Sequence, residues 1–219
     1  MTLTMMGPPG AGKGTQAKLL GEKFGIPVIS TGEILREAMR AGTALGEQAR
    51  GFMEAGDLVP DDVMIGIVAG RLRRPDCQPG FILDGFPRTV PQADALAATL
   101  AAMGTRLDLA ISLDAPEQEI IRRLSGRRVC RACGQGFHLL YDPPPHPGRC
   151  GRCGGELHQR EDDVEGTVRA RLHAYQEKTL PLLAYYEARG LLRVVDGVGP
   201  IEEVLQRLLA VVSEGSPRA

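Results

Sequence analysis

"GPPGAGKGT", residues 7–15, is a glycine-rich loop with a single lysine, set between two short segments of regular structure. The apolar residues 3–6 ("LTMM") before it predict a β-strand. Residues 16–25 ("QAKLLGEKFG") carry apolar side chains at helical spacing and end on a glycine. A strand, a glycine loop and a helix in this order are the context that a P-loop requires. The opening of the chain therefore predicts an α/β protein that binds phosphate groups.

The residue types in this loop suit phosphate binding. Glycines let backbone N–H groups converge on phosphate oxygens, and the N-terminus of the following helix adds partial positive charge. Lys13 brings a full charge to the terminal phosphates. The common pattern has Ser or Thr directly after the lysine, whereas here Gly14 precedes Thr15. The sequence therefore leaves open whether Thr15 is a direct ligand of Mg²⁺.

Four further apolar segments predict strands, and helical patterns separate them. These segments are "PVIS" (27–30), "FILD" (81–84), "LDLAISLD" (107–114) and "LLRVVD" (191–196). Strands that alternate with helices imply a parallel sheet covered on both faces, with ligands at the carboxyl ends of the strands. The predicted fold is a P-loop α/β fold with a parallel five-stranded sheet flanked by helices.

Two local patterns add detail to the predicted helices. Ser30, with Glu33 three residues later, predicts a capping box at the start of a helix over residues 31–42. Pro181 predicts a bend in the long helical stretch over residues 164–190.

The composition narrows the classes of protein. The 219 residues are 43% apolar, enough for one substantial core and a small appended module. The formal net charge of -1 argues against general attraction to nucleic acid or anionic membranes. No apolar run approaches ~18 residues and no charged leader precedes the first strand, so we expect a soluble cytoplasmic protein. One continuous core makes a monomer the simplest expectation.

The α/β pattern breaks from Gly126 to about Glu161, where Gly, Pro, Cys and His are frequent and periodicity is weak. Two C-x-x-C pairs, separated by sixteen residues, lie in this stretch: Cys130, Cys133, Cys150 and Cys153. In a reducing compartment such pairs favour a metal over disulfides, and four thiolates make a closed, structural zinc site. Four cysteines suffice, so the histidines nearby are not needed as ligands. Zinc would stabilise a module with too little apolar content to fold alone.

Several separated motifs carry a resemblance to a known family. "STGEILR" (30–36), "GDLVP" (56–60) and "LDGFPRT" (83–89), together with the P-loop, resemble nucleoside monophosphate kinases, and the adenylate kinase family most closely. The second half of the chain adds "GRRVC", "REDD", "TVRARL" and "VVDG" in the order of the family. The resemblance implies reversible, Mg²⁺-dependent phosphoryl transfer from ATP to AMP, giving two ADP, with a long lid of the zinc-binding type.

The resemblance also implies roles for individual residues. Binding of ATP falls to Gly10, Ala11, Gly12, Lys13, Gly14, Thr15, Arg123, Arg127 and Gly199. Binding of AMP falls to Thr31, Arg36, Asp57, Leu58, Val59, Gly85, Arg88, Gln92, Arg160 and Arg171, with Gln92 reading the adenine edge through its amide. The predicted catalytic set is Lys13, Asp84, Arg88, Arg123, Arg160 and Arg171, with Asp84 accepting Mg²⁺-bound waters. The acceptor phosphate is already ionised, so no general base is needed.

The same resemblance divides the chain. The expected core comprises residues 1–29, 60–125 and 163–219, interrupted by an AMP-binding helical segment (30–59) and by the zinc-binding, ribbon-like lid (126–162). We expect the lid to swing over the ATP site and carry Arg160 inward, which excludes water.

Two alternatives remain. The nearer is a kinase whose acceptor is UMP, CMP or GMP, because the shape of the acceptor pocket cannot be read from the sequence. The more distant is a nucleic-acid-binding protein in which the arginine-rich ribbon contacts DNA or RNA. Few aromatic side chains in the ribbon and the net negative charge argue against the second alternative.

Overall fold

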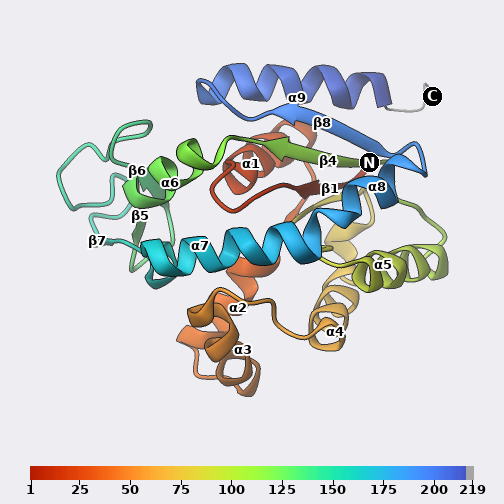
Figure 1. The fold of residues 1–219 in the computed structure, drawn as a ribbon, viewed down its shortest axis with the longest axis horizontal. Coiled ribbons are helices and arrows are strands. Elements are labelled where there is room, and N and C mark those ends of the chain that lie inside the picture. The colour runs from red at the N-terminus through yellow and green to blue at the C-terminus, as the bar shows by residue number, and fades with distance from the viewer. Residues whose placement is uncertain (216–219) are drawn as a thin grey trace.

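The computed structural model describes residues 1–215, so the last four residues of the predicted core, 216–219, lie outside the described residues. One five-stranded, all-parallel sheet has the order β2-β3-β1-β4-β8 (Figure 1). Its strands are β1 (Thr2–Met6), β2 (Val28–Ser30), β3 (Phe81–Asp84), β4 (Leu109–Asp114) and β8 (Leu192–Asp196). The predicted α/β fold class is therefore confirmed.

Side chains of the central strands alternate between two apolar cores, one on each face of the sheet. Met5 packs into one core and Met6 into the other, and Ile82 and Leu83 divide in the same way. Strands buried on both faces explain why the predicted segments are continuous apolar runs. The parallel register brings the carboxyl ends of β1 and β3 together, since Met5 pairs with Asp84.

Helices cover both faces of the sheet. The helices are α1 (Lys13–Phe24), α2 (Thr31–Arg40), α3 (Ala44–Ala55), α4 (Asp61–Leu72), α5 (Val90–Ala102), α6 (Glu117–Gly126), α7 (Glu165–Ala174), α8 (Pro181–Glu187) and α9 (Ile201–Gly215). Residues of α1, α6, α7 and α9 form one core, and residues of α2, α3, α4, α5 and α8 form the other. Short helical turns occupy Pro75–Cys77 and Glu161–Asp163, and a π-helical turn occupies Tyr175–Thr179.

The two local predictions fared differently. The capping box was wrong, because Ser30 precedes α2 without a side-chain capping bond. The Glu33 carboxylate instead accepts a hydrogen bond from Lys18 at 3.1 Å. The bend at Pro181 stays a prediction, but the regular helix is interrupted nearby: a π-turn follows α7, and α8 begins at the proline.

A second, antiparallel sheet of order β6-β5-β7 lies at the end of α6, at the left of Figure 1. It consists of β5 (Arg127–Cys130), β6 (Gly136–His138) and β7 (Leu157–His158). Among residues 126–162, the buried side chains are those of Val129, Cys130 and Cys150. This small sheet therefore has almost no apolar core of its own.

Within residues 1–215, no helix is both long and apolar enough to span a membrane.

Candidate active site

Two cavities lie above the carboxyl ends of the central strands, where the parallel sheet predicts ligands. The first is lined by Thr31, Gly32, Leu35, Arg36, Met53, Gly56, Asp57, Leu58, Val59, Met64, Gly85, Arg88, Gln92, Asp162 and Arg171. Its lining has an apolar part and a cationic part. Leu35, Val59 and Met64 form an apolar part, and arginines form the other part. A flat apolar group with an attached anion fits a cavity that is apolar in one part and cationic in the other.

The second cavity is larger and follows the glycine loop. It is lined by the predicted loop residues Gly10, Ala11, Gly12, Lys13, Gly14 and Thr15, by Asp84, Arg123, Arg127, Arg160 and Gly199, and by lid residues that include Phe137, His138 and Tyr141. Five residues line both cavities, namely Gly32, Arg36, Gly85, Arg88 and Arg171. The two cavities therefore meet at a junction that contains three arginines.

The structure thus brings the predicted residues together around two adjoining spaces, with one departure. Arg160 lines the second cavity but not the first, although the sequence analysis placed it in the AMP-binding and catalytic sets. Its Nε is buried and has no hydrogen-bond acceptor among residues 1–215. Burial and the neighbouring Arg127 and Arg36 together lower the pKa of Arg160 to about 9. A buried N–H without an acceptor is costly, so an anion in the second cavity would be a favourable partner for this guanidinium.

Lys13 lies at the first position of α1 and turns back over the loop. Its Nζ donates to the carbonyl oxygens of Gly7 and Pro8, each at 2.8 Å. Burial lowers the pKa of Lys13 to about 7; the Asp84 carboxylate opposes this shift, and Arg88 and Arg171 add to it. A bound polyphosphate would favour the charged form of the lysine.

Gly14 departs from the usual Ser or Thr after the P-loop lysine, and the structure gives a steric reason. A Cβ atom at this position would lie 3.2 Å from Oδ2 of Asp84, which is tighter than an ordinary contact. The absent side chain lets the carboxylate at the end of β3 approach the N-terminus of α1. Thr15, the next residue, is exposed at the cavity.

Positive charge dominates the junction. Six cations gather there, Lys13, Arg36, Arg88, Arg127, Arg160 and Arg171, against four carboxylates, Glu33, Asp84, Asp162 and Asp163. Burial lowers the pKa of Arg88 to about 10, and the like charges of Arg171 and Arg36 contribute. The site is therefore built to receive negative charge.

Asp162 and Asp163, in the turn before α7, hold part of this cluster in place. The fully buried Asp163 carboxylate accepts two hydrogen bonds from Arg127, from Nε at 2.7 Å and from Nη2. Asp162 Oδ2 lies 3.1 Å from Arg171 Nη1 and 4.0 Å from Arg36 Nη1. Since Arg127 begins β5, its bidentate pair with Asp163 ties the base of the small sheet to the turn before α7.

Gln92 is buried beneath the first cavity, and both ends of its amide are engaged. Its Oε1 accepts from the backbone N–H of Arg88 at 2.8 Å, and its Nε2 donates to Oδ1 of Asp61 at 2.7 Å. An amide oxygen has two lone pairs and an amide nitrogen two hydrogens, so one acceptor and one donor remain for a ligand. The sequence analysis missed Asp61, although Thr89 and Gln92 match the T-x-x-Q capping pattern that orients this part of the chain.

Arg123 projects from α6 into the second cavity and is tightly held. Its three nitrogens donate to Glu119 Oε1 at 2.7 Å, to the carbonyl of Ala11 at 3.1 Å and to the carbonyl of Gly197 at 2.9 Å. Arg123 therefore joins the glycine loop to the end of β8. Glu119 is a second residue that the sequence analysis missed, and its i,i+4 spacing from Arg123 on a helix was the available signal.

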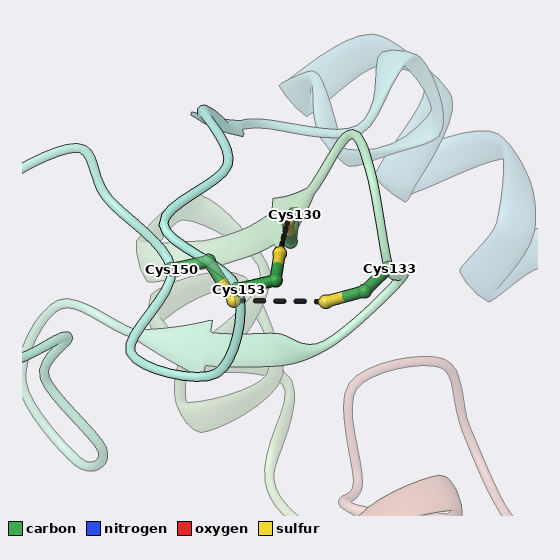
Figure 2. A group of neighbouring side chains, drawn as sticks. All are labelled: Cys130, Cys133, Cys150 and Cys153. Carbon is green, nitrogen blue, oxygen red and sulfur yellow. Dashed lines mark hydrogen bonds between the residues drawn. The ribbon is translucent and has the colours of Figure 1, made fainter.

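The four cysteines of the small sheet converge on one point (Figure 2), and Sγ of each lies within 4.8 Å of the others. Cys130 and Cys153 are 3.5 Å apart at sulfur, and Cys133 and Cys150 are 3.6 Å apart. A tetrahedron with Zn–S bonds of about 2.3 Å has edges of about 3.8 Å, so these sulfurs could hold a metal ion. They are too far apart for disulfide bonds.

The backbone around the sulfurs supports the same chemistry. Two equivalent turns present the pairs: Gly134 N–H donates to the Cys130 carbonyl at 3.0 Å, and Gly154 N–H donates to the Cys150 carbonyl at 2.8 Å. Backbone amides of Cys133 and Ala132 help lower the pKa of the Cys130 thiol to about 6, whereas hydrogen bonds to the neighbouring thiols raise the pKa of Cys153. Cys130 is therefore the thiol of the cluster that most readily takes the thiolate form, which is the form that binds metal.

Comparison with known proteins gives one consistent result. The adenylate kinase family model matches residues 5–191. An adenylate kinase of Geotalea daltonii is 53% identical over 212 residues, which cover 97% of this chain and 99% of that protein. Adenylate kinases of Citrifermentans bemidjiense (55% over 212 residues) and Archaeoglobus fulgidus (51% over 214 residues) cover 97% and 98% of this chain and 99% of their own lengths. The chain belongs to the adenylate kinase family.

Proposed function

We propose that this chain is an ATP:AMP phosphotransferase, which moves a phosphoryl group reversibly from ATP to AMP and yields two ADP. The observation that carries the proposal is the junction of the two cavities. One cavity follows a P-loop and the other has an apolar part, and they meet at Arg36, Arg88 and Arg171. Two nucleotides bound in them would face each other through their phosphates, where six cations oppose four carboxylates.

The second cavity is the proposed ATP site. The backbone amides of residues 10–15 and Lys13 would cradle the β- and γ-phosphates. Asp84 faces the same space and offers the hard oxygen that Mg²⁺ prefers, directly or through water. Mg²⁺, when bound with ATP, neutralises phosphate charge. Arg123 holds the loop through the carbonyl of Ala11, and Gly197 and Gly199 line the same cavity.

The first cavity is the proposed AMP site. Arg36 and Arg88 would hold the phosphate through paired guanidinium donors, with Arg171 at the junction itself. Thr31 donates to the carbonyl of Gly85 at 3.0 Å and shapes the floor of the cavity, and the backbone of residues 57–59 borders the base. The attacking phosphate oxygen carries charge already, so positioning and charge neutralisation account for catalysis without a general base.

The small sheet over residues 126–162 is the proposed lid, with a structural zinc ion on its four cysteines. It carries Arg127 and Arg160 toward the second cavity, and closure would exclude water from the phosphoryl group in transit. Residues 30–59 form the proposed AMP-binding segment, and the remainder forms the core. We expect the chain to act as a monomer in the cytoplasm, where reduced thiols remain available to the metal.

A panel of acceptors tests the proposed activity. Purified protein with Mg²⁺ and ATP should phosphorylate AMP at least tenfold faster than UMP, CMP, GMP or dTMP, because one amide in a buried pocket distinguishes bases strongly. The products are separated by nucleotide chromatography at equal acceptor concentration. Equal turnover of a pyrimidine nucleotide would overturn the choice of AMP, and no turnover of any acceptor would overturn the proposed reaction.

A further inference from the structure

We propose that Asp61 sets the preference of the acceptor site for 6-aminopurines over 6-oxopurines, by fixing which end of the Gln92 amide is the donor. This inference rests on the proposed function, since it concerns the base of the nucleotide in the first cavity. Asp61 is the first residue of α4 and touches Gln92 on α5, the helix that packs beside α4 (Figure 1).

The contacts of Gln92 permit only one orientation of its amide. Asp61, as a carboxylate, can only accept, so the nitrogen of the amide must face it. The backbone N–H of Arg88 can only donate, so the amide oxygen must face Arg88. A flipped amide would place its oxygen against the carboxylate and its N–H groups against the N–H of Arg88. Both contacts would then be repulsive.

Asp61 is itself held so that it cannot turn away. Its other oxygen, Oδ2, accepts from the hydroxyl of Thr89 at 2.8 Å, and Thr89 caps α5 by accepting from the backbone N–H of Gln92 at 3.3 Å. Gln92 is 2% exposed, so little room remains for water to replace either partner of the amide. The donor and acceptor that Gln92 offers to a ligand are therefore fixed before the ligand arrives.

The fixed amide matches one kind of purine. Adenine presents a 6-amino donor beside the N1 acceptor, whereas hypoxanthine and guanine present a 6-oxo acceptor beside an N1–H donor. The two patterns are the reverse of each other, so a 6-oxopurine would need the flipped amide. A buried site that leaves such groups mismatched rejects the wrong ligand strongly.

The test compares AMP with inosine monophosphate, which differs from AMP only at position 6 and in the protonation of N1. The variant Asp61→Asn can present its NH2 to the oxygen of a flipped Gln92, so it removes one of the two repulsive contacts of the flipped amide and leaves only the contact with the N–H of Arg88. We expect the ratio of kcat/KM for AMP to kcat/KM for inosine monophosphate to fall about tenfold or more, with the KM for ATP unchanged. The neighbouring Asp62→Asn, which removes an exposed carboxylate of the same helix, is the matched control and should leave the ratio as it is.

A folded Asp61→Asn protein whose ratio stays within twofold of the original would overturn the inference. Failure of the unchanged protein to phosphorylate AMP would overturn the proposed function instead. If Asp61→Asn does not fold, a measurement on the unchanged protein tests whether the Gln92 amide is held in place. The side-chain NH2 protons of Gln92, followed by NMR without nucleotide, should exchange slowly with solvent. Exchange at the rate of a free amide would show that the amide is not held.

Discussion

Replacing Arg88 with alanine is expected to lower kcat/KM for AMP about 10³-fold, because the guanidinium lies where the two cavities meet. The loss should not come from unfolding. Burial and the like charges of Arg171 and Arg36 all disfavour the charged form of Arg88, which holds its pKa at about 10. Removing this charge relieves repulsion, so the free energy of unfolding should stay the same or rise.

Two further variants serve for comparison with Arg88→Ala: the conservative Arg88→Lys and the exposed control Arg73→Ala. Lysine keeps a positive charge but loses the planar fork and the bond from Nε to the carbonyl of Gly85 at 2.9 Å, so an intermediate loss is expected. Arg73 is exposed at the end of α4, and its removal should leave kcat/KM within about twofold. Steady-state kinetics and thermal denaturation give both quantities. Near-normal kcat/KM in Arg88→Ala would remove this arginine from the site.

Loss of the metal is the second large effect that we expect. Metal analysis should find one zinc per chain, and Cys150→Ser or chelation should unfold the lid while the core remains folded. The buried side chains of residues 126–162 are only Val129, Cys130 and Cys150, so apolar burial stabilises the lid little. Zinc supplies roughly 10 to 16 kcal/mol of folding free energy to small modules of this kind. Hydrogen exchange should show that the backbone amides of β5, β6 and β7 lose their protection. The kcat/KM for AMP should fall as well, because Arg127 and Arg160 are carried by this part of the chain.

Cys77→Ser is the matched control for the zinc experiment. Cys77 is buried beside Arg71, far from the cluster along the chain, and is not among the four sulfurs that converge. Its replacement should leave one zinc per chain and leave the protection of the lid unchanged. A zinc-free Cys150→Ser protein with normal hydrogen exchange and normal kcat/KM would contradict the structural role of the metal.

Much of the fold could be predicted from the sequence, because both faces of the sheet are buried. Continuous apolar runs such as "FILD" identify the strands, and the glycine loop fixes the order of the first strand and helix. The capping box at Ser30 failed because a sequence pattern does not show that Glu33 has another partner, Lys18, fifteen residues earlier. The position of the π-turn was also not predictable, although Pro181 predicted an interruption nearby.

The candidate site could likewise be predicted only in part from the sequence. The residues that line the cavities follow local motifs, so the sequence located them. Which residue pairs with which could not be read for partners far apart along the chain: Gln92 meets Asp61 across 31 residues, and Arg127 meets Asp163 across 36. Arg160 lines the second cavity and not the first, which only the folded structure could show. Spacing therefore predicted which residues form the site, and packing determines what each one contacts.

A structure with a bisubstrate mimic, two adenosines joined through a chain of five phosphates, tests whether two nucleotides bind end to end across the junction. We predict one molecule per chain, with one adenosine in each cavity and the phosphate chain in contact with Lys13, Arg36 and Arg88. A complex in which these three side chains point away from the phosphates would contradict it.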